Sequence, residues 1–293
     1  MYEKLEVCPS CKFTEFKNEL IVTDYLVTGE SFALVKCKKC QLLFTNPRPE
    51  PINISKYYES EDYISHQNKG TNLTNIIYKL VRRITLKKKC KLISKYQESG
   101  SIMDFGCGTG DFLLTCKKAG WQVTGVEVDE GARSLAAKKI ESENIFASTE
   151  NIKKNQKFDV ITAWHVLEHV HELKPTIKLL KKRLKKDGTM IIAVPNYLSY
   201  DSNYYKEFWA GYDVPRHLYH FSKQSFSYLM SKARLSLIDI RPMRFDSYYV
   251  SLLSEKYKKG KSNFFKAFIM GYRSNSQAEK TGNFSSLIYV LKK

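Results

Sequence analysis

Over residues 101–194, short apolar runs alternate with segments in which apolar residues recur at helical spacing. The runs predict strands at 101–105, 122–128, 144–146, 158–163 and 189–194. The intervening segments predict helices at 111–119, 130–140 and 172–185. Strands that alternate with helices of roughly 10 to 15 residues form βαβ units. We therefore expect an α/β fold in which helices cover both faces of a parallel sheet.

The last third of the chain is less regular. It predicts a helix at 223–234 and strands at 235–241 and 286–291, which brings the expected sheet to seven strands, mostly parallel. An aromatic, proline-containing stretch at 195–221 and an insertion at about 250–283 interrupt the pattern, and we interpret both as lid-like segments. The aromatic residues of the first segment suit stacking on a sugar or a base, and equally suit the core of an irregular subdomain.

The first 98 residues divide into two parts. Short β segments surround two Cys-x-x-Cys pairs within residues 1–50, and prolines at 47, 49 and 51 forbid regular structure after them. From Asn72 onward, apolar residues recur at helical spacing with basic residues opposite, which predicts a long amphipathic helix. We expect a small module at 1–50, a helical linker or cap at 51–98 and the main domain at 99–293.

Composition and charge narrow the function classes. The 293-residue chain has no uncharged apolar run of roughly 18 residues and no apolar stretch at its start. We therefore expect no membrane insertion, no signal peptide and a cytoplasmic location. The formal net charge of +18 fits a nucleic acid, an anionic sugar nucleotide or a phosphorylated lipid as partner. It also fits solvated, lysine-rich helix faces, so charge alone selects no substrate.

Four of the seven cysteines form two closely spaced pairs, Cys8 with Cys11 and Cys37 with Cys40. A two-residue spacing lets both thiolates of one turn reach the same ion, and four thiolates complete the tetrahedral coordination of a structural zinc. The odd cysteine total, without an export signal, favours reduced thiols over disulfides. We expect a zinc ribbon, with free thiols or a redox pair as the alternatives.

A glycine-rich turn separates the first predicted strand from the first predicted helix, where doubly wound sheets bind nucleotide-like ligands. Its sequence over 104–110 differs from G-x-G-x-x-G because the third glycine comes one residue early and Asp111 takes its place. Asp104 and Asp111 would repel a diphosphate but suit a ligand with an ammonium and a sulfonium. Glu127, at the end of the second strand, can accept both hydroxyls of a ribose. A purely structural glycine turn is the alternative.

Three motifs together resemble the successive signatures of class I S-adenosylmethionine (SAM)-dependent methyltransferases: the 104–110 turn, Val126-Glu127 and Trp-His-Val-Leu-Glu-His-Val at 164–170. The resemblance covers about residues 99–293 and implies a Rossmann-like fold with SAM as cofactor. It implies these donor-binding residues: Asp104, Gly106, Cys107, Gly108, Gly110, Glu127, Val128, Trp164 and His165. Residues 148–150 depart from the pattern, because many members carry an aspartate there that faces the adenine amino group.

A zinc ribbon followed by a proline-rich segment and this domain is similar to a bacterial branch of the superfamily, some of whose relatives methylate sugars. The sugar C-methyltransferases of that branch are longer and carry a further C-terminal domain, so the likeness bears on architecture more than on substrate. Neither Asp-Pro-Pro-Tyr nor Asn-Pro-Pro-Tyr occurs in the chain, which disfavours methylation of an exocyclic base amine.

Methyl transfer from a sulfonium needs an oriented nucleophile and, for a hydroxyl or an acidic carbon, removal of its proton. Histidine suits that role near neutral pH, and five of the six histidines fall in two segments, 165–171 and 217–220. We expect the catalytic residues among His217, His165, His220, Tyr219 and Arg216. In this interpretation His217 is the base, and Arg216 favours its neutral form or binds an acceptor phosphate. Structural roles are the alternative for each histidine.

The resulting hypothesis is a SAM-dependent methyltransferase acting on a small, anionic molecule: a sugar, a nucleotide-linked sugar or another biosynthetic precursor. The choice between O- and C-methylation stays open, as do the identity of the acceptor and the oligomeric state. An RNA methyltransferase is the second hypothesis, because the ribbon and the basic helices suit phosphate contacts. A catalytically silent SAM-binding protein is the third.

Overall fold

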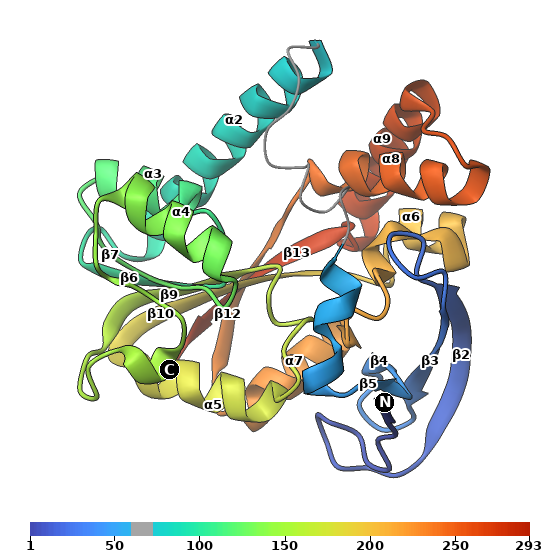
Figure 1. The fold of residues 1–293 in the computed structure, drawn as a ribbon, viewed down its shortest axis with the longest axis horizontal. Helices are drawn as coiled ribbons and strands as arrows, with labels where there is room; N and C mark the ends of the chain where they lie inside the picture. Colours follow the sequence, from blue (N-terminus) through green and yellow to red (C-terminus); the bar gives the residue numbers. More distant parts are fainter. Residues whose placement is uncertain (60–72) are drawn as a thin grey trace.

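The computed structural model describes residues 1–59 and 73–293. A seven-stranded sheet forms its centre, in the order β12–β13–β10–β9–β6–β7–β8 (Figure 1). The strands are β6 (Ser101–Phe105), β7 (Gln122–Val126), β8 (Ile145–Phe146), β9 (Phe158–Trp164), β10 (Leu184–Pro195), β12 (Ser236–Pro242) and β13 (Ser286–Lys292). β13 is antiparallel to both of its neighbours, whereas β10, β9, β6, β7 and β8 pair in parallel. The predicted seven-stranded, mostly parallel sheet is confirmed.

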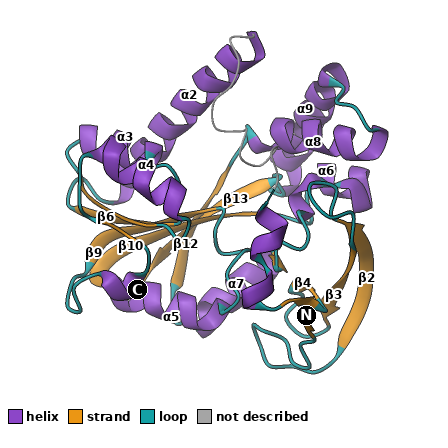
Figure 2. Cartoon of the chain, viewed as in Figure 1, coloured by secondary structure: helices purple, strands orange, loops and turns teal. Residues whose placement is uncertain are grey.

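Helices cover both faces of this sheet, as predicted (Figure 2). One face carries α2 (Leu73–Tyr96), α3 (Asp111–Lys118) and α4 (Glu130–Ile140), and the other carries α5 (Leu173–Arg183) and α7 (Lys223–Lys232). Successive strand residues point to opposite faces. Accordingly Ile102, Val160 and Ile191 pack in the core cluster of the first group of helices. Their neighbours Met103, Ile161 and Ile192 pack in the core cluster of the second.

The two irregular segments of the main domain are mostly helical. The stretch 195–221 contains α6 (Tyr200–Tyr205), two single-turn helices and the short strand β11 (Tyr219–His220). The insertion forms a hairpin of α8 (Asp246–Lys259) and α9 (Phe264–Thr281), which packs against α6. Three of the six tyrosines in the first segment, Tyr197, Tyr205 and Tyr212, are buried with Trp209 in a common cluster with residues of the N-terminal module. Their packing agrees with the subdomain-core interpretation, and a lid function for either segment stays a prediction.

The N-terminal module is built into the main domain through a shared sheet. Its strands are β1 (Tyr2–Glu3), β2 (Phe16–Thr23), β3 (Ser31–Cys37), β4 (Leu43–Thr45) and β5 (Arg48–Pro49). The module's sheet has the order β11–β4–β3–β2, so its edge strand β11 comes from the 195–221 segment. The boundary near residue 50 stays a prediction.

The predicted long helix before Gly100 is present as α2. The start proposed at Asn72 lies outside the described residues, as does part of the predicted linker at 51–98, namely 60–72. Within the described ranges, no helix has the length and apolar content needed to cross a membrane.

Candidate functional site

The glycine turn connects β6 to α3 at the point where the strand order reverses, because β7 lies on one side of β6 and β9 on the other. Gly106, Gly108 and Gly110 all have positive φ, at 74°, 51° and 77°. A Cβ on Gly106 would lie 2.4 Å from a methyl of Val166, whereas a Cβ on Gly108 would meet nothing within 4 Å. Protein side chains therefore pack tightly against Gly106, whereas the space beside Gly108 is open.

A cavity of about 380 Å³ opens over this turn, at the carboxyl ends of β6 and β9. Its wall includes the turn itself, the start of α3, one side of α2 and the start of α8, with these residues: Val81, Arg82, Thr85, Leu86, Lys89, Asp104, Gly106, Cys107, Gly108, Thr109, Asp111, Phe112, Trp164, Phe245, Asp246 and Tyr249. Five of the predicted donor-binding residues line it: Asp104, Gly106, Cys107, Gly108 and Trp164. The predicted turn and the predicted end of the fourth strand are thus brought together.

Asp104 is the buried anion of this cavity. Only 2% of the residue is exposed, and its carboxylate accepts a hydrogen bond of 2.6 Å from the hydroxyl of Thr162. Burial raises the pKa of Asp104 to about 7, although the Thr162 hydrogen bond and the charge of Lys89 lower it in part. A cationic ligand group would remove this penalty.

Two basic residues of α2 complete the cavity, and the sequence reasoning did not single them out. The half-buried ammonium of Lys89 lies 4.3 Å from the ring centroid of Trp164, and burial lowers the pKa of Lys89. Arg82 lies two helical turns earlier on α2 and pairs with Asp111 at 2.5 Å. The seven-residue spacing of these two cations on a predicted helix was the available signal.

Asp111 behaves differently from the expectation that it would repel a diphosphate. It forms ion pairs with Arg82 at 2.5 Å and with Lys139 at 2.7 Å. Its charge is therefore compensated within the protein. The electrostatic argument against a diphosphate rests on Asp104 alone.

Glu127 lies beside the open part of the turn. Its carboxylate accepts hydrogen bonds from the N–H of Gly108, at 2.8 Å, and of Asp129, at 3.0 Å. The next residue, Val128, is an apolar side chain with 82% of its surface exposed. Together they offer a carboxylate and an apolar surface next to the turn, which suits a ribose and the face of a base.

His165 follows β9 with φ at +57° and lies between two carboxylates. Its Nδ1 lies 3.3 Å from Glu168 Oε1, and its Nε2 lies 3.0 Å from Asp246 Oδ2. Burial lowers the pKa of His165, but the two carboxylates outweigh that effect and raise it to about 9. At neutral pH His165 is therefore an imidazolium, which donates hydrogen bonds and removes no proton.

The rings of His217 and His220 lie near each other, with 6.4 Å between their centroids. His217 is 8% exposed, and its Nδ1 contacts the carbonyl oxygen of Gly211 at 3.0 Å. The His169 and His217 rings meet edge to face with 4.6 Å between centroids. His220 is 3% exposed and its Nε2 lies 3.5 Å from the hydroxyl of Thr45, and burial brings its pKa well below the ordinary value. His217 and His220 are thus close together, while the second is enclosed by the N-terminal module.

Arg216 and Tyr219 form buried contacts within the protein, and their expected roles toward the acceptor stay predictions. Arg216 is 1% exposed, and its guanidinium donates to Asp213, Asp24 and the carbonyl oxygen of Tyr57. The hydroxyl of Tyr219, also 1% exposed, accepts a hydrogen bond from Arg48 and donates to the carbonyl oxygen of His171. Both side chains tie the 195–221 segment to the N-terminal module.

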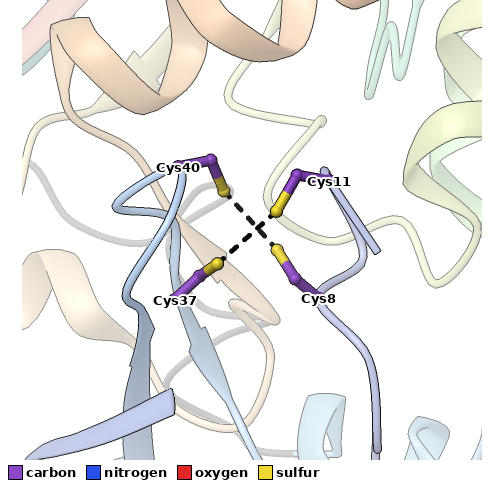
Figure 3. A group of neighbouring side chains, drawn as sticks. All are labelled: Cys8, Cys11, Cys37 and Cys40. Carbon is purple, nitrogen blue, oxygen red and sulfur yellow. Dashed lines mark hydrogen bonds between the residues drawn. The ribbon is translucent and has the colours of Figure 1, made fainter. Parts of the chain in front are cut away.

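The four cysteines of the two pairs converge at one point (Figure 3). Cys8 and Cys40 have their sulfur atoms 3.5 Å apart, as do Cys11 and Cys37. Zinc–sulfur bonds of about 2.3 Å in a tetrahedron place the sulfur atoms about 3.8 Å apart, so a zinc ion fits this cluster with little adjustment. Each pair is followed by a residue in the left-handed conformation, Lys12 and Gln41, whose N–H donates to the carbonyl oxygen of the first cysteine. The predicted four-cysteine cluster is confirmed.

Comparison with known proteins agrees with this geometry. A family model described as a methyltransferase domain matches residues 80–240. The ubiquinone biosynthesis O-methyltransferase of Pelagibacter ubique (strain HTCC1062) is 36% identical over 100 residues, which cover 32% of this chain and 42% of that protein. The protein of the same name from Actinobacillus pleuropneumoniae serotype 7 (strain AP76) is 32% identical over 106 residues, which cover 32% of this chain and 45% of that protein. The match thus spans less than half the length of these curated relatives.

A solved structure extends the likeness over most of the fold. Magnesium protoporphyrin IX methyltransferase from Synechocystis PCC 6803, solved with bound SAH, superposes with a TM-score of 0.53 at 14% identity, over 82% of this chain and 98% of that chain. The methyltransferase family model covers more than half of the present chain, and the strand order, the glycine turn and the cavity above it agree with that assignment. The chain therefore belongs to the class I SAM-dependent methyltransferases.

Proposed function

We propose that this protein transfers the methyl group of SAM to a small molecule that carries negative charge. The observation that carries the proposal is the cavity over the glycine turn, in which the buried carboxyl group of Asp104 and the half-buried ammonium of Lys89 line the same space. The methionyl part of SAM is a zwitterion and presents one charge to each group. SAM supplies the methyl group on its sulfonium, and the residues of the chain bind and orient the two reactants.

In this proposal Asp104 and the turn of Gly106–Gly110 hold the ammonium end of the donor, and Lys89 with Arg82 holds its carboxylate. Glu127 accepts the ribose hydroxyls, and Val128 packs on the adenine. The indole N–H of Trp164 is buried and has no hydrogen-bond partner within the described residues, so it is available to a ligand in the cavity. Trp164 and His165 then separate the donor from the acceptor. A zinc ion at Cys8, Cys11, Cys37 and Cys40 belongs to the same proposal as a structural metal.

The acceptor is placed on the side of His165, Asp246 and His217. His217 is proposed as the group that removes the proton, since its Nδ1 is engaged by a carbonyl oxygen and its Nε2 carries the lone pair. His165 orients the acceptor as an imidazolium, and His220 supports this side from the N-terminal module. The names of the curated relatives favour an oxygen nucleophile over a carbon one.

A second cavity supports an anionic acceptor. It has a volume of about 320 Å³ and shares Lys89, Phe245 and Asp246 with the first. Arg241 and Arg244 also line it, but each has an acidic partner, Asp239 or Glu279. The excess positive charge there comes from the lysines of α2, namely Lys88, Lys89 and Lys95. A phosphate or carboxylate of the acceptor fits this surface.

The test is incubation of the purified protein with labelled SAM and fractions of a cell extract, followed by mass identification of the product. We expect a labelled small molecule, and we expect the Glu127→Ala variant to yield much less of it. Label that appears only in RNA, with a steep loss of activity as salt rises, would instead support the RNA hypothesis. SAM binding without any labelled product would support the non-catalytic one.

A further inference from the structure

Glu168, His169 and His217 form a second cluster of metal-binding groups, separate from the four cysteines. One ligand atom from each of the three residues lies within 4.8 Å of the other two. Three ligand atoms bonded at about 2.0–2.2 Å to one ion lie about 3.3–3.8 Å apart, so side-chain movements of up to about 1 Å would bring all three onto one cation. Glu168 and His169 follow β9, and His217 comes from the loop before β11.

The carboxylate of Glu168 lacks the hydrogen bonds that a buried carboxylate requires. The residue is 0% exposed, and neither of its oxygen atoms accepts a hydrogen bond from the described part of the chain. Oε1 has an ion-pair contact of 3.3 Å with His165 Nδ1, which leaves Oε2 without a partner. A buried carboxylate oxygen without a hydrogen bond is unfavourable, and within the described residues Oε2 has none, although His165 supplies positive charge beside Oε1.

Both histidines are oriented as metal ligands usually are. His217 Nδ1 lies 3.0 Å from the carbonyl oxygen of Gly211, and His169 Nδ1 lies 3.1 Å from the carbonyl oxygen of Arg216. A carbonyl oxygen only accepts, so Nδ1 of His217 carries a hydrogen and donates it to Gly211. In His169, Nδ1 lies near two partners, because the hydroxyl of Tyr58 is also 3.0 Å from it. A backbone carbonyl that fixes the tautomer of a metal-binding histidine in this way is a recurrent feature of metal sites.

The charges around the cluster also favour a cation. Asp213 Oδ2 lies 4.0 Å from His217 Nε2 and adds negative charge. The nearby guanidinium of Arg216 is compensated, because it pairs with Asp24 at 2.9 Å and with Asp213 at 2.7 Å. Two imidazoles and one carboxylate form a ligand set that binds first-row divalent ions and leaves coordination positions for other ligands.

We propose that Glu168, His169 and His217 bind a divalent transition-metal ion, which holds an oxygen of the methyl acceptor beside the donor cavity. The second half of this inference rests on the proposed function, and it makes His217 a metal ligand in place of the base. His165 connects the two sites, because it contacts Glu168 on one side and the cavity residue Asp246 on the other. A bound cation lowers the pKa of a coordinated hydroxyl. The hydroxyl proton then leaves to water, the oxygen–carbon bond forms as the carbon–sulfur bond breaks, and the sulfur keeps the electron pair.

The test uses the full chain with zinc present at the cysteines and Mn²⁺ as the probe, because Mn²⁺ has little affinity for thiolates. Electron paramagnetic resonance measures the loss of the free Mn²⁺ signal during titration. We expect one Mn²⁺ per chain, and at least tenfold weaker binding in both His217→Ala and Glu168→Gln. The matched control is His171→Ala, since His171 lies in the same region but its Nε2 contacts the carbonyl oxygen of Pro49 at 3.1 Å. Circular dichroism and SAM affinity check that each variant is folded.

Failure of Mn²⁺ to bind the wild-type protein, or equal binding by a folded His217→Ala variant, would overturn the metal site. Methyl transfer that survives complete chelation would overturn its role in holding the acceptor and would leave the proposed function intact, with His217 as the base. Mn²⁺ binding with no methyl transfer to any acceptor fraction would overturn the proposed function and confirm the site.

Discussion

Replacing Asp104 with asparagine should stabilise the ligand-free protein and weaken SAM binding at the same time. The pKa of Asp104 is raised from 3.8 to about 7, chiefly by burial. The folded state holds this proton more tightly than the unfolded chain does. The resulting cost to folding is absent below about pH 4, grows between about pH 4 and pH 7, and is complete above that range. A difference of this size corresponds to roughly 4 kcal/mol against folding at pH 8.

The asparagine variant removes that cost but introduces a buried amide N–H that needs a partner. An unsatisfied N–H costs roughly 1–3 kcal/mol, which reduces the gain in stability. Its side-chain oxygen can still accept the 2.6 Å hydrogen bond from Thr162. We therefore expect a net gain on the order of 1–3 kcal/mol at pH 8 and no gain near pH 4, measured by urea unfolding without SAM. SAM binding loses a charge-assisted contact to its ammonium, so calorimetry should show roughly 10- to 100-fold weaker binding.

Asp159 offers a matched control at the other end of the sheet. Burial raises the pKa of Asp159, but the hydrogen bonds from Lys185 and Ser101 bring it below its ordinary value. Its contribution to stability is therefore present at neutral pH and is lost as the pH falls through its lowered pKa. Asp159→Asn should destabilise the protein at pH 8 and leave SAM affinity unchanged. If Asp104→Asn also destabilises the protein at pH 8, or binds SAM as well as wild type does, the assignment of Asp104 to the donor site is wrong.

The remaining predictions concern the ribose, the zinc and the base. Glu127→Ala should weaken SAM binding by roughly 1–3 kcal/mol, and the wild type should bind no NAD. Calorimetry with both ligands tests this, and NAD binding or wild-type SAM affinity in the variant would contradict it. In Cys37→Ser, metal analysis should find no zinc, and turnover should fall more than SAM affinity. If metal analysis finds no zinc in wild-type protein purified under reducing conditions, the zinc ribbon is wrong. His217→Ala should lower turnover by about 10²-fold with SAM affinity nearly unchanged, whereas a loss of SAM binding would show that His217 is structural.

The features that were predictable from the sequence depend on local spacing. A strand buried on both faces is largely apolar, as β10 is over 190–195, and the shorter apolar runs of β6 and β9 are each interrupted by a polar residue that the structure uses. The glycines at 106, 108 and 110 were predictable as a turn because the backbone needs positive φ there. The cysteine pairs were predictable because a two-residue spacing is what one ion demands.

The features that were missed depend on packing between distant segments. Lys89 belongs to the donor cavity because α2 packs on α3 and beside Trp164, which helical periodicity alone does not indicate. Arg216 was expected at the acceptor because it precedes His217, yet its guanidinium reaches Asp24, a residue 192 positions earlier. Glu168 was named only as part of a motif, and its missing partner is visible only once its burial is known.

The four-cysteine cluster and the proposed acceptor side are joined through one strand, and we therefore predict that zinc at the cluster affects turnover. β4 lies between β3, which ends at Cys37, and β11, which carries His220. At the end of β4, Thr45 donates from its hydroxyl to the carbonyl oxygen of His217, at 2.9 Å, and from its N–H to that of Leu218, at 3.0 Å. The glycine turn is instead held from β7, where the N–H groups of Gly106 and Cys107 donate to the carbonyl oxygen of Val126. Loss of the metal would therefore displace the acceptor histidines through β4 before it disturbed the donor cavity, and this is why turnover should fall before SAM affinity does.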